Sequence, residues 1–382
     1  MPVRVLIAPN AFKHSLSATA AAEAIREGLR RSALDCQCTL FPVGDGGDGT
    51  GELIVQRFKG NRVSVEVRDP LDRNIHASYG LIDADRTAVI ELASASGLRL
   101  LQREELDPLH ATTFGTGQLI RSALDAGVHR ILLAVGGSAT VDAGTGILRA
   151  LGARFLDSTG AELPSLPQDL SKLESIDLKN LDPRAGNCEL VVLCDVENPL
   201  LGERGSARVF GPQKGASPDS VRALESGLAQ FSRVVLRQTG VDVGFIPRGG
   251  AAGGVPAGLH ALAGAKLVRG IDCFLELTGF DEALRNADLV ITGEGRMDHQ
   301  TLEGKAPMGV ARRAREKGRR TVAMAGSVEL SAEPALRKYF DDLRPIANSS
   351  TPLEIALRDA RRNLEVAASA LGNDLAATDS HE

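Results

Sequence analysis

The sequence predicts an α/β protein of two domains, and three observations support this. Short β-branched runs alternate with helix-period segments along most of the chain, which is typical of parallel strands joined by crossover helices. One stretch of period-two alternation interrupts that pattern, and a helix–strand–helix pattern returns near the C-terminus. At 382 residues the chain is also long enough for two domains of roughly 100 to 200 residues each.

The β-branched runs predict six strands in the alternating part of the chain. They are Val3–Ala8, Cys38–Val43, Ile131–Val135, Leu190–Cys194, Leu289–Thr292 and Thr321–Met324. A helix is predicted over Ala18–Leu34, because apolar residues recur on one face and Ser17 can cap its N-terminus.

The interruption lies between Arg62 and Ala93. The segment VSVEV alternates with period two and DPLDRN is a turn sequence, so we expect an antiparallel meander. A second domain is therefore expected over residues 61–284, inserted into a first domain made of residues 1–60 and 285–382. The polar C-terminal segment NDLAATDSHE is predicted to fray.

Composition excludes several classes of partner. A formal net charge of -5 without a basic half, and only 3% aromatic residues, argue against nucleic acid. No run approaches the ~18 apolar residues of a membrane span. The five cysteines lack zinc-ligand spacing, so we expect reduced thiols in a cytoplasmic protein.

Polar, glycine-rich segments follow five of the predicted strands. In open parallel sheets ligands bind beyond the carboxyl ends of the strands, so these segments are the expected place of a site. Any single one of them is equally well explained as an ordinary turn. Together they hold many carboxylates and most of the candidate cations. The segments are APNAFKHSL, GDGGDGT, GGSATVDAGTG, DVENPLLG and GEGRMDHQTLEGKAP, and the cations are Lys13, Lys214, Arg296 and Lys305.

Phosphoryl transfer is the chemistry that uses all of these parts. It needs amides that hold phosphate oxygens, cations that neutralise charge, carboxylates that hold Mg²⁺ and a base near the attacking hydroxyl. The run from Gly136 to Thr140 can form a nest of backbone amides with hydroxyl donors, and Lys214 lies in GPQKG. The sequence contains no G-x-x-x-x-G-K-[ST] pattern, so a P-loop is not expected.

GDGGDGT has the spacing of a dinucleotide fingerprint, which keeps an NAD(P)-dependent dehydrogenase open as an alternative. Asp45 and Asp48 would repel a bare pyrophosphate, however, and Glu66 and Asp69 fall in the meander instead of after a second parallel strand. With Mg²⁺ present the same aspartates become plausible ligands. A non-catalytic small-acid binding protein is the other alternative, and the surplus of carboxylates argues against it.

Nine motifs in this order resemble the bacterial glycerate kinase family, class I, over nearly the whole chain. They are APNAFKHSLSA, GDGGDGT, GTGQLI, GGSATVDAG, CDVENPLLG, VFGPQKGA, AAGGVPAGL, ITGEGRMDHQTLEGKAP and AMAGSV. The resemblance implies transfer of the ATP γ-phosphate to the C2 hydroxyl of D-glycerate with Mg²⁺, in organic-acid catabolism of the glyoxylate type. It also implies a flavodoxin-like domain with a parallel sheet and a restriction-enzyme-like domain with a mixed sheet. Homo-oligomerisation stays open.

The resemblance also implies roles for the residues that stand at motif positions. As catalytic residues we expect Asp195, Asp298, Lys13 and Arg296; as ATP-binding residues Gly136, Gly137, Ser138, Thr140, Lys214, Glu294 and Lys305; as metal ligands Asp45, Asp48 and Asp142. Asp195 and Asp298 are each expected as base or metal ligand, and Arg296 as a carboxylate clamp. Asn198 also stands at a motif position.

The chain departs from the family pattern at three places. Asn10 and Ala11 stand where many members have Asp and Ser, Val141 where many have Asn, and His299 where Ser is commoner. None of these changes removes an aspartate or glutamate from the set named above, so we expect activity to be retained.

Overall fold

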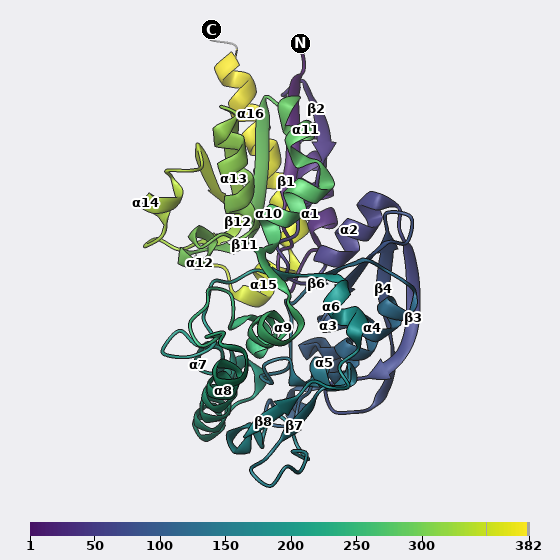
Figure 1. Ribbon diagram of the computed structural model, residues 1–382. Helices are drawn as coiled ribbons and strands as arrows, with labels where there is room; N and C mark the ends of the chain where they lie inside the picture. Colours follow the sequence, from purple (N-terminus) through teal and green to yellow (C-terminus); the bar gives the residue numbers. More distant parts are fainter. Residues whose placement is uncertain (349, 380–382) are drawn as a thin grey trace. The chain divides into compact units, whose positions relative to one another are not determined.

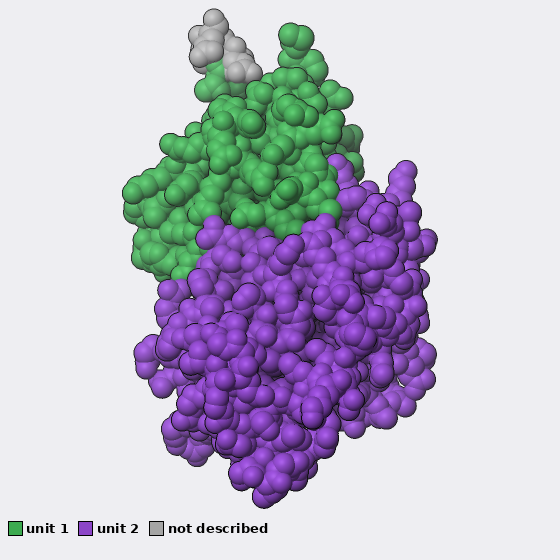
Figure 2. Space-filling model, in the orientation of Figure 1, with its two compact units in different colours: residues 1–45, 271–382 green, residues 46–270 purple. Residues whose placement is uncertain are grey.

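The computed structural model describes residues 1–348 and 350–379 (Figure 1). It contains two compact units, coloured separately in Figure 2: residues 1–45 with 271–382, and residues 46–270. The first unit is discontinuous in sequence and the second is continuous. The domain limits at residues 60 and 285 stay a prediction. In the described part of the chain, no helix combines the length and apolar character that a membrane crossing requires.

The first unit is built on a five-stranded sheet in which every neighbouring pair is parallel. Its strands are β1 (Val3–Pro9), β2 (Cys36–Leu40), β11 (Leu289–Met297), β12 (Arg320–Val328) and β13 (Asp342–Pro345). Their spatial order is β2-β1-β11-β12-β13. Counted along the unit this is 2-1-3-4-5, the flavodoxin-like doubly wound order, which places the switch point between β1 and β11.

Helices cover both faces of this sheet, as the alternation of β12 shows. Val322 and Met324 belong to a core shared with α1 (Ala18–Arg30) and α16 (Ala360–Asp379). Ala323 and Ala325 belong to a second core shared with α13 (Ala306–Glu316) and α14 (Glu333–Leu336). Burial on both faces explains why the strands read as nearly continuous apolar runs. The remaining helices of the unit are α10 (Gly270–Thr278), α11 (Phe280–Arg285), α12 (His299–Leu302) and α15 (Leu353–Arg358).

The second unit is built on a six-stranded mixed sheet of order β10-β9-β6-β5-β4-β3. The strands are β3 (Asn61–Arg68), β4 (Asn74–Ile82), β5 (Thr87–Glu91), β6 (Arg130–Ala134), β9 (Glu189–Cys194) and β10 (Lys266–Arg269). The first three form an antiparallel meander, and β5, β6, β9 and β10 are parallel. A small antiparallel ribbon is made by β7 (Arg154–Leu156) and β8 (Ser175–Asp177).

Helices also lie on both faces of the mixed sheet. Ala88 and Ile90 of β5 pack in the core with α4 (Phe114–Asp125), while Val55 of α2 (Thr50–Phe58) lies against Gly80 of β4 on the opposite face. The other α-helices of the unit are α3 (Ala93–Ser96), α5 (Thr145–Ala150), α6 (Pro183–Asn187), α7 (Ser206–Phe210), α8 (Pro218–Thr239) and α9 (Val255–Ala263).

The sequence-based fold class is confirmed: the protein is α/β, with one parallel and one mixed sheet. All six predicted strands and the meander are present, and the Ser17 side chain accepts a hydrogen bond from the Ala20 amide as the predicted cap of α1. Several predictions of extent were wrong. Helix α1 ends at Arg30, β2 ends at Leu40 instead of Val43, β11 continues five residues beyond Thr292, β12 continues four residues beyond Met324, and the tail through Asp379 is helical. Residues 380–382 lie outside the described residues.

Candidate functional site

The predicted site residues fall into one cluster in each unit. In the first unit they follow β1 and β2, or lie at the carboxyl end of β11 and just after it; these are the strands around the switch point, where ligands of doubly wound sheets bind. That cluster holds Lys13, Asp45, Glu294, Arg296, Asp298 and Lys305. The cluster of the second unit holds Asp48, Gly136, Gly137, Ser138, Thr140, Asp142, Asp195 and Lys214.

Asp45 is a buried carboxylate at the end of the β2 connection. Its Oδ2 accepts a hydrogen bond of 2.9 Å from the Asn10 side-chain amide and one of 3.4 Å from the backbone amide of Ala306. Asn10, one of the departures from the family pattern, therefore gives Asp45 a neutral donor where an aspartate would add a second negative charge. Asp45 as a metal ligand stays a prediction.

Glu294 lies on β11 and not in a loop, because the strand continues through Met297 by pairing with β12. Its Oε1 accepts a hydrogen bond of 2.8 Å from the Thr301 hydroxyl. Burial raises the pKa of Glu294 to about 7, against the opposing effect of the Lys305 charge and the Thr301 hydrogen bond. The carboxyl can therefore exchange a proton near neutral pH.

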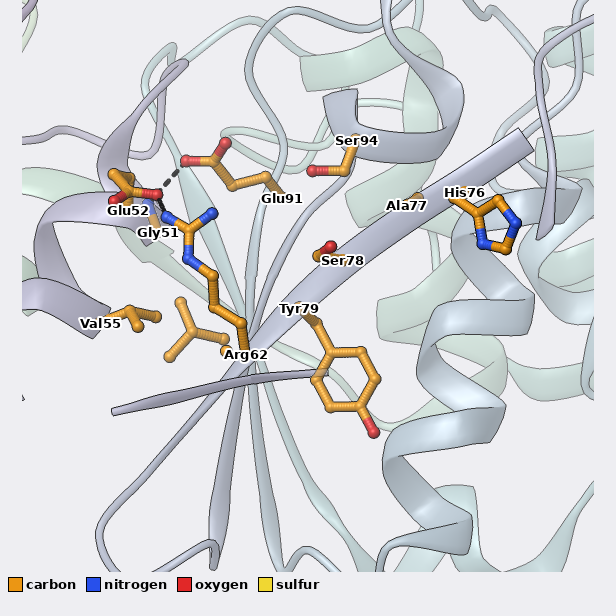
Figure 3. A pocket seen from close by; sticks show the side chains of 12 residues that line it. Gly51, Glu52, Val55, Arg62, His76, Ala77, Ser78, Tyr79, Glu91 and Ser94 are labelled. Atoms are coloured by element: carbon orange, nitrogen blue, oxygen red, sulfur yellow. Dashed lines mark hydrogen bonds and ion pairs between the residues drawn. The ribbon is translucent and has the colours of Figure 1, made fainter. Parts of the chain in front are cut away.

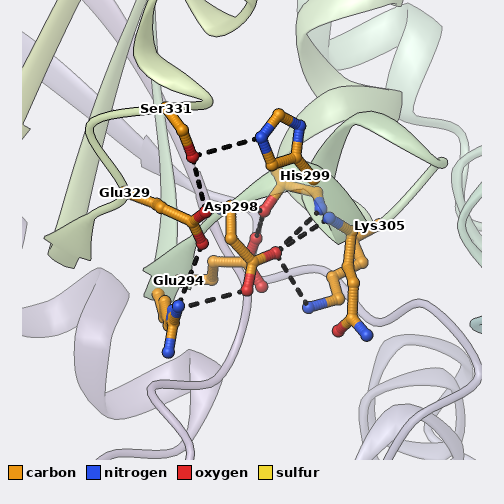
Figure 4. A network of polar contacts seen from close by, with 9 residues as sticks. Glu294, Asp298, His299, Lys305, Glu329 and Ser331 are labelled. Atoms are coloured by element: carbon orange, nitrogen blue, oxygen red, sulfur yellow. Dashed lines mark hydrogen bonds and ion pairs between the residues drawn. The ribbon is translucent and has the colours of Figure 1, made fainter. Parts of the chain in front are cut away.

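Arg296 is already held by two carboxylates. Its guanidinium lies 2.9 Å from Glu329 Oε2 and 3.4 Å from Asp298 Oδ2. Glu329 in turn accepts a hydrogen bond of 2.6 Å from Ser331, whose hydroxyl lies 3.2 Å from Nε2 of His299 (Figure 4). Ser331 and Arg296 lower the pKa of Glu329. For Arg296 to clamp a substrate carboxylate, the substrate has to compete with Glu329.

Glu329 was missed by the sequence analysis, although a usable signal was present. It directly follows β12, and the rule that picked the other segments, polar residues at the ends of predicted strands, applies to it equally.

Asp298 caps the short helix α12. Its Oδ1 accepts hydrogen bonds from the backbone amides of Gln300, at 2.9 Å, and Thr301, at 3.3 Å. Nζ of Lys305 lies 4.0 Å from the same oxygen. Figure 4 shows Asp298 at the centre of this network, with Lys305 reaching toward it. These contacts fix the orientation of the carboxylate at the start of α12.

Lys214 is a buried cation in the second unit, 2% exposed. It ends a short 3-10 turn, Pro212–Lys214, and its Nζ donates hydrogen bonds of 2.7 Å to the Ser138 hydroxyl and to the Thr140 carbonyl. Burial lowers the pKa of Lys214 to about 7, while the charges of Asp142 and Asp195 oppose that shift. Lys214 thus fixes the segment that the sequence predicted to form an amide nest.

Asp142 is completely buried and accepts four hydrogen bonds. Oδ2 receives the Thr113 amide at 2.9 Å, the Thr113 hydroxyl at 2.7 Å and the Gly146 amide at 3.2 Å, and Oδ1 receives the Gly144 amide at 3.0 Å. Burial raises the pKa of Asp142, opposed by the Thr113 contacts. These contacts are those of a carboxylate that shapes the loop before α5, and its role as a metal ligand stays a prediction. Nothing in the sequence identified Thr113 as its partner.

Asp48 and Asp195 lie in two different loops of the second unit, before α2 and after β9. Asp48 forms an ion pair of 2.9 Å with Arg99 and is partly exposed. Asp195 directly follows β9 and is partly buried. Asn198 is fixed by a hydrogen bond of 2.8 Å from its side-chain amide to the Arg204 carbonyl, which shapes the segment after Asp195.

A preformed metal cage is not found among the residues that the structure describes, where no three His, Cys, Asp or Glu side chains converge. Mg²⁺ usually takes only one or two protein carboxylates and completes its shell with water and phosphate oxygens. Asp45 and Asp48 each offer carboxylate oxygens of this kind, so either residue by itself fits that mode of binding.

Comparison with known proteins gives a match over almost the entire chain. Residues 5–376 match the sequence pattern of the glycerate kinase family. The chain is 43% identical to "Glycerate kinase" of Halalkalibacterium halodurans, over 95% of this chain and 96% of that protein. It is 40% identical to "Glycerate 2-kinase" of Escherichia coli K12, over 95% of both. A solved structure from Salmonella typhimurium LT2, provisionally named glycerate kinase 2, aligns with a TM-score of 0.82 and 42% identity over 100% of both chains.

Proposed function

We propose, because the chain belongs to the glycerate kinase family, that it transfers the γ-phosphate of ATP to D-glycerate. The observation that carries the proposal is the full-length match, which includes relatives named for this activity at 40% identity or more. The product we propose is 2-phosphoglycerate, in agreement with the name of the Escherichia coli relative.

The cations of the two clusters supply what phosphoryl transfer needs most, which is neutralisation of charge on the phosphate oxygens. We assign this role to Lys13 and Lys305 in the first unit, and the holding of the Gly136–Thr140 amides in place to Lys214 in the second. Arg296 would exchange Glu329 for the glycerate carboxylate. Mg²⁺, when bound through Asp45 or Asp48, would supply further positive charge at the phosphates.

Asp195 is our choice for the base that receives the proton of the glycerate hydroxyl. Asp298 was the other candidate, but its Oδ1 accepts two amide hydrogen bonds as the cap of α12, and Lys305 and Arg296 lie beside it. Both oxygens of Asp298 are therefore already engaged by groups of the protein. Asp298 then serves to hold Lys305 and Arg296 in position.

The reaction and its position are tested together by ³¹P NMR of the products formed from D-glycerate and ATP. A 2-phosphoglycerate resonance that requires ATP and disappears when EDTA is added is the expected result. A 3-phosphoglycerate resonance would reject the proposed position, and the absence of any phosphoglycerate would reject the function.

The assignment of the base is tested with Asp195→Asn, and Asp219→Asn is the control because Asp219 is an exposed residue of α8 in the same unit. We expect kcat to fall by about 10²- to 10⁴-fold in the first variant, the range for a positioned acid–base group. The control should retain the wild-type rate. Equal rates for Asp195→Asn and wild type would remove Asp195 from the mechanism.

A further inference from the structure

The GDGGDGT motif continues into α2, and the residue that holds this junction lies forty positions further along the chain. Glu91 is the last residue of β5, at the carboxyl end of a parallel strand. We propose that Glu91 is a positioning residue that fixes residues 46–51, and with them Asp48, for phosphoryl transfer. The inference rests on the proposed function and adds to it a residue that lies outside the family motifs quoted above.

The Glu91 carboxylate receives backbone donors from the junction itself. The Gly51 amide donates a hydrogen bond of 2.7 Å to Oε1, and the Gly49 backbone also stabilises the carboxylate. Hydrogen bonds from amides to an ionised carboxylate are shorter and stronger than those between neutral groups. Glu91 therefore holds the last turn of the loop and the first residues of α2 on the end of β5.

The glycine at position 51 leaves the space that this contact uses. A Cβ atom at Gly51 would lie 2.8 Å from Cγ of Glu91 and 3.2 Å from its Oε1, closer than side chains normally approach. The absence of a side chain at Gly51 thus lets the carboxylate reach the backbone. The two residues are matched in shape, although they are far apart in sequence.

Glu91 is one of several anchors of the same loop within the second unit. The Gly136 amide donates to the Gly46 carbonyl at 3.0 Å, which ties the start of the loop to the end of β6. The Gly46 amide donates to the Thr50 hydroxyl at 3.0 Å, and Asp48 is paired with Arg99. Because Asp48 lies between the Gly46 and Gly51 anchors, loss of the Glu91 contact should displace it.

A buried carboxylate costs electrostatic free energy at this position, and packing of the same space does not need a charged group. Burial raises the pKa of Glu91, and the nearby Asp48 charge adds to that shift. A pocket of about 290 Å³ lies beside the carboxylate, lined also by Glu52, Arg62, Ser78 and Ser94. Figure 3 shows Glu91 reaching across its rim toward Gly51, on the same side as Glu52 and Arg62. The pocket gives the carboxylate access to water, which lowers the cost of ionisation.

The test compares Glu91→Gln and Glu91→Ala with Glu52→Gln, a matched control. Glu52 is the residue next to Gly51, and its carboxylate pairs with Arg62 instead of the loop backbone. The first measurement is amide hydrogen exchange in peptides that cover residues 46–58. We expect faster exchange in Glu91→Ala, an intermediate rate in Glu91→Gln, whose amide oxygen still accepts from Gly51, and the wild-type rate in the control.

The second measurement is steady-state kinetics per folded protein. A displaced loop should lower kcat by roughly 10- to 100-fold in Glu91→Ala, the loss expected for hydrogen bonds to a charged group, and raise KM for the metal–nucleotide. Partial unfolding would instead leave KM unchanged. Glu91→Gln, which preserves size, should recover part of the rate and keeps the test valid if Glu91→Ala does not fold.

Two outcomes would overturn the inference: wild-type exchange in both Glu91 variants, or kinetics in both that match Glu52→Gln. Failure of the proposed function is distinguishable, because wild-type protein would then form no phosphoglycerate while the exchange experiment would still report on the loop.

Discussion

Lys214 illustrates how a single buried cation can hold a glycine-rich segment in place. A lysine without solvent is costly, and such groups are seldom fully buried unless they are paired. Here the ammonium is satisfied by the Ser138 hydroxyl and the Thr140 carbonyl, both 2.7 Å away. The sequence placed Lys214 in a ligand-binding set on the basis of its motif. The structure adds that its contacts hold the glycine-rich segment.

Replacement of Lys214 by Met should lower kcat/KM by about 10²- to 10³-fold, the typical cost of losing one preorganised donor to developing charge, because the Gly136–Thr140 amides that Lys214 holds would lose their fixed position. Lys266→Met is the control, because Lys266 is an exposed residue of the same unit paired with Glu189. Stability is checked by urea denaturation, so that loss of turnover is separated from loss of fold. Turnover of Lys214→Met equal to that of the control would contradict the assignment.

Glu294 predicts a specific pH dependence of stability. Its pKa is raised in the folded state to about 7, so folded protein binds this proton more tightly than unfolded protein does. The tighter binding of this proton stabilises the folded protein. That stabilisation is fully present below about pH 4.5 and is lost as pH rises through about 7. A pKa shift of this size corresponds to about 3 kcal/mol.

The variant Glu294→Gln lacks this titrating group, so its stability does not contain the pH-dependent part. We therefore expect the difference in free energy of unfolding, wild type minus variant, to decrease from pH 5 to pH 8. The measurement is urea denaturation at several pH values, with Glu316→Gln, an exposed change on α13, as the reference. A difference that stays constant with pH would show that Glu294 does not titrate in this window.

At the scale of elements, β11 shows where local pattern and tertiary pairing disagree. The segment after Thr292 contains two glycines and two charged residues, which favour a loop in isolation. Pairing with β12, Glu294 with Ala325 and Arg296 with Ser327, extends the strand instead. A residue pattern reports local preference, whereas hydrogen bonds to a neighbouring strand override it.

The AAGGVP segment of the second unit makes a close backbone contact with the loop around Thr140. Gly253 has φ +74°, its carbonyl accepts the Ala143 amide at 2.9 Å, and a Cβ atom there would lie 2.1 Å from the Thr140 carbonyl oxygen. The segment therefore packs against the loop around Thr140, which Lys214 also holds through its hydrogen bonds to Ser138 and Thr140.

Gly253→Ala should destabilise the protein by about 2 to 4 kcal/mol, because it combines backbone strain with a steric clash in a packed site. Gly186→Ala in α6 is the matched control: nothing lies within 4 Å of its Cβ position, and no left-handed φ is involved. The control should be neutral or slightly stabilising. Thermal denaturation compares the two, and similar melting temperatures would refute the packing argument.

At the scale of the whole molecule, the two units differ in how the chain builds them. Residues 46–270 form one uninterrupted segment with a large apolar core of its own, which includes Ile90, Leu133 and Phe231. The first unit needs residues from both ends of the chain, since β1 pairs with β11 nearly three hundred positions away.

A fragment of residues 46–270 should therefore fold cooperatively when expressed alone, because a continuous segment with its own core meets the requirements of a domain. We expect helical and strand signals in far-UV circular dichroism and a single urea transition, without kinase activity, since Glu294, Arg296 and Lys305 are missing. Residues 1–45 expressed alone are the contrasting case and should stay unfolded. An unfolded 46–270 fragment would show that its core depends on the rest of the chain.

The sequence by itself determined the α/β class, the meander, the six strands and the family, because apolar periodicity and long motifs are local properties of the chain. It also pointed to strand ends as the place of the site. Only the tertiary structure decided that β11 extends past Glu294, that Arg296 is shared with Glu329, and that Glu91 holds Gly51. Each of these depends on contacts between residues distant in sequence, and one-dimensional spacing carries no information about which distant groups meet.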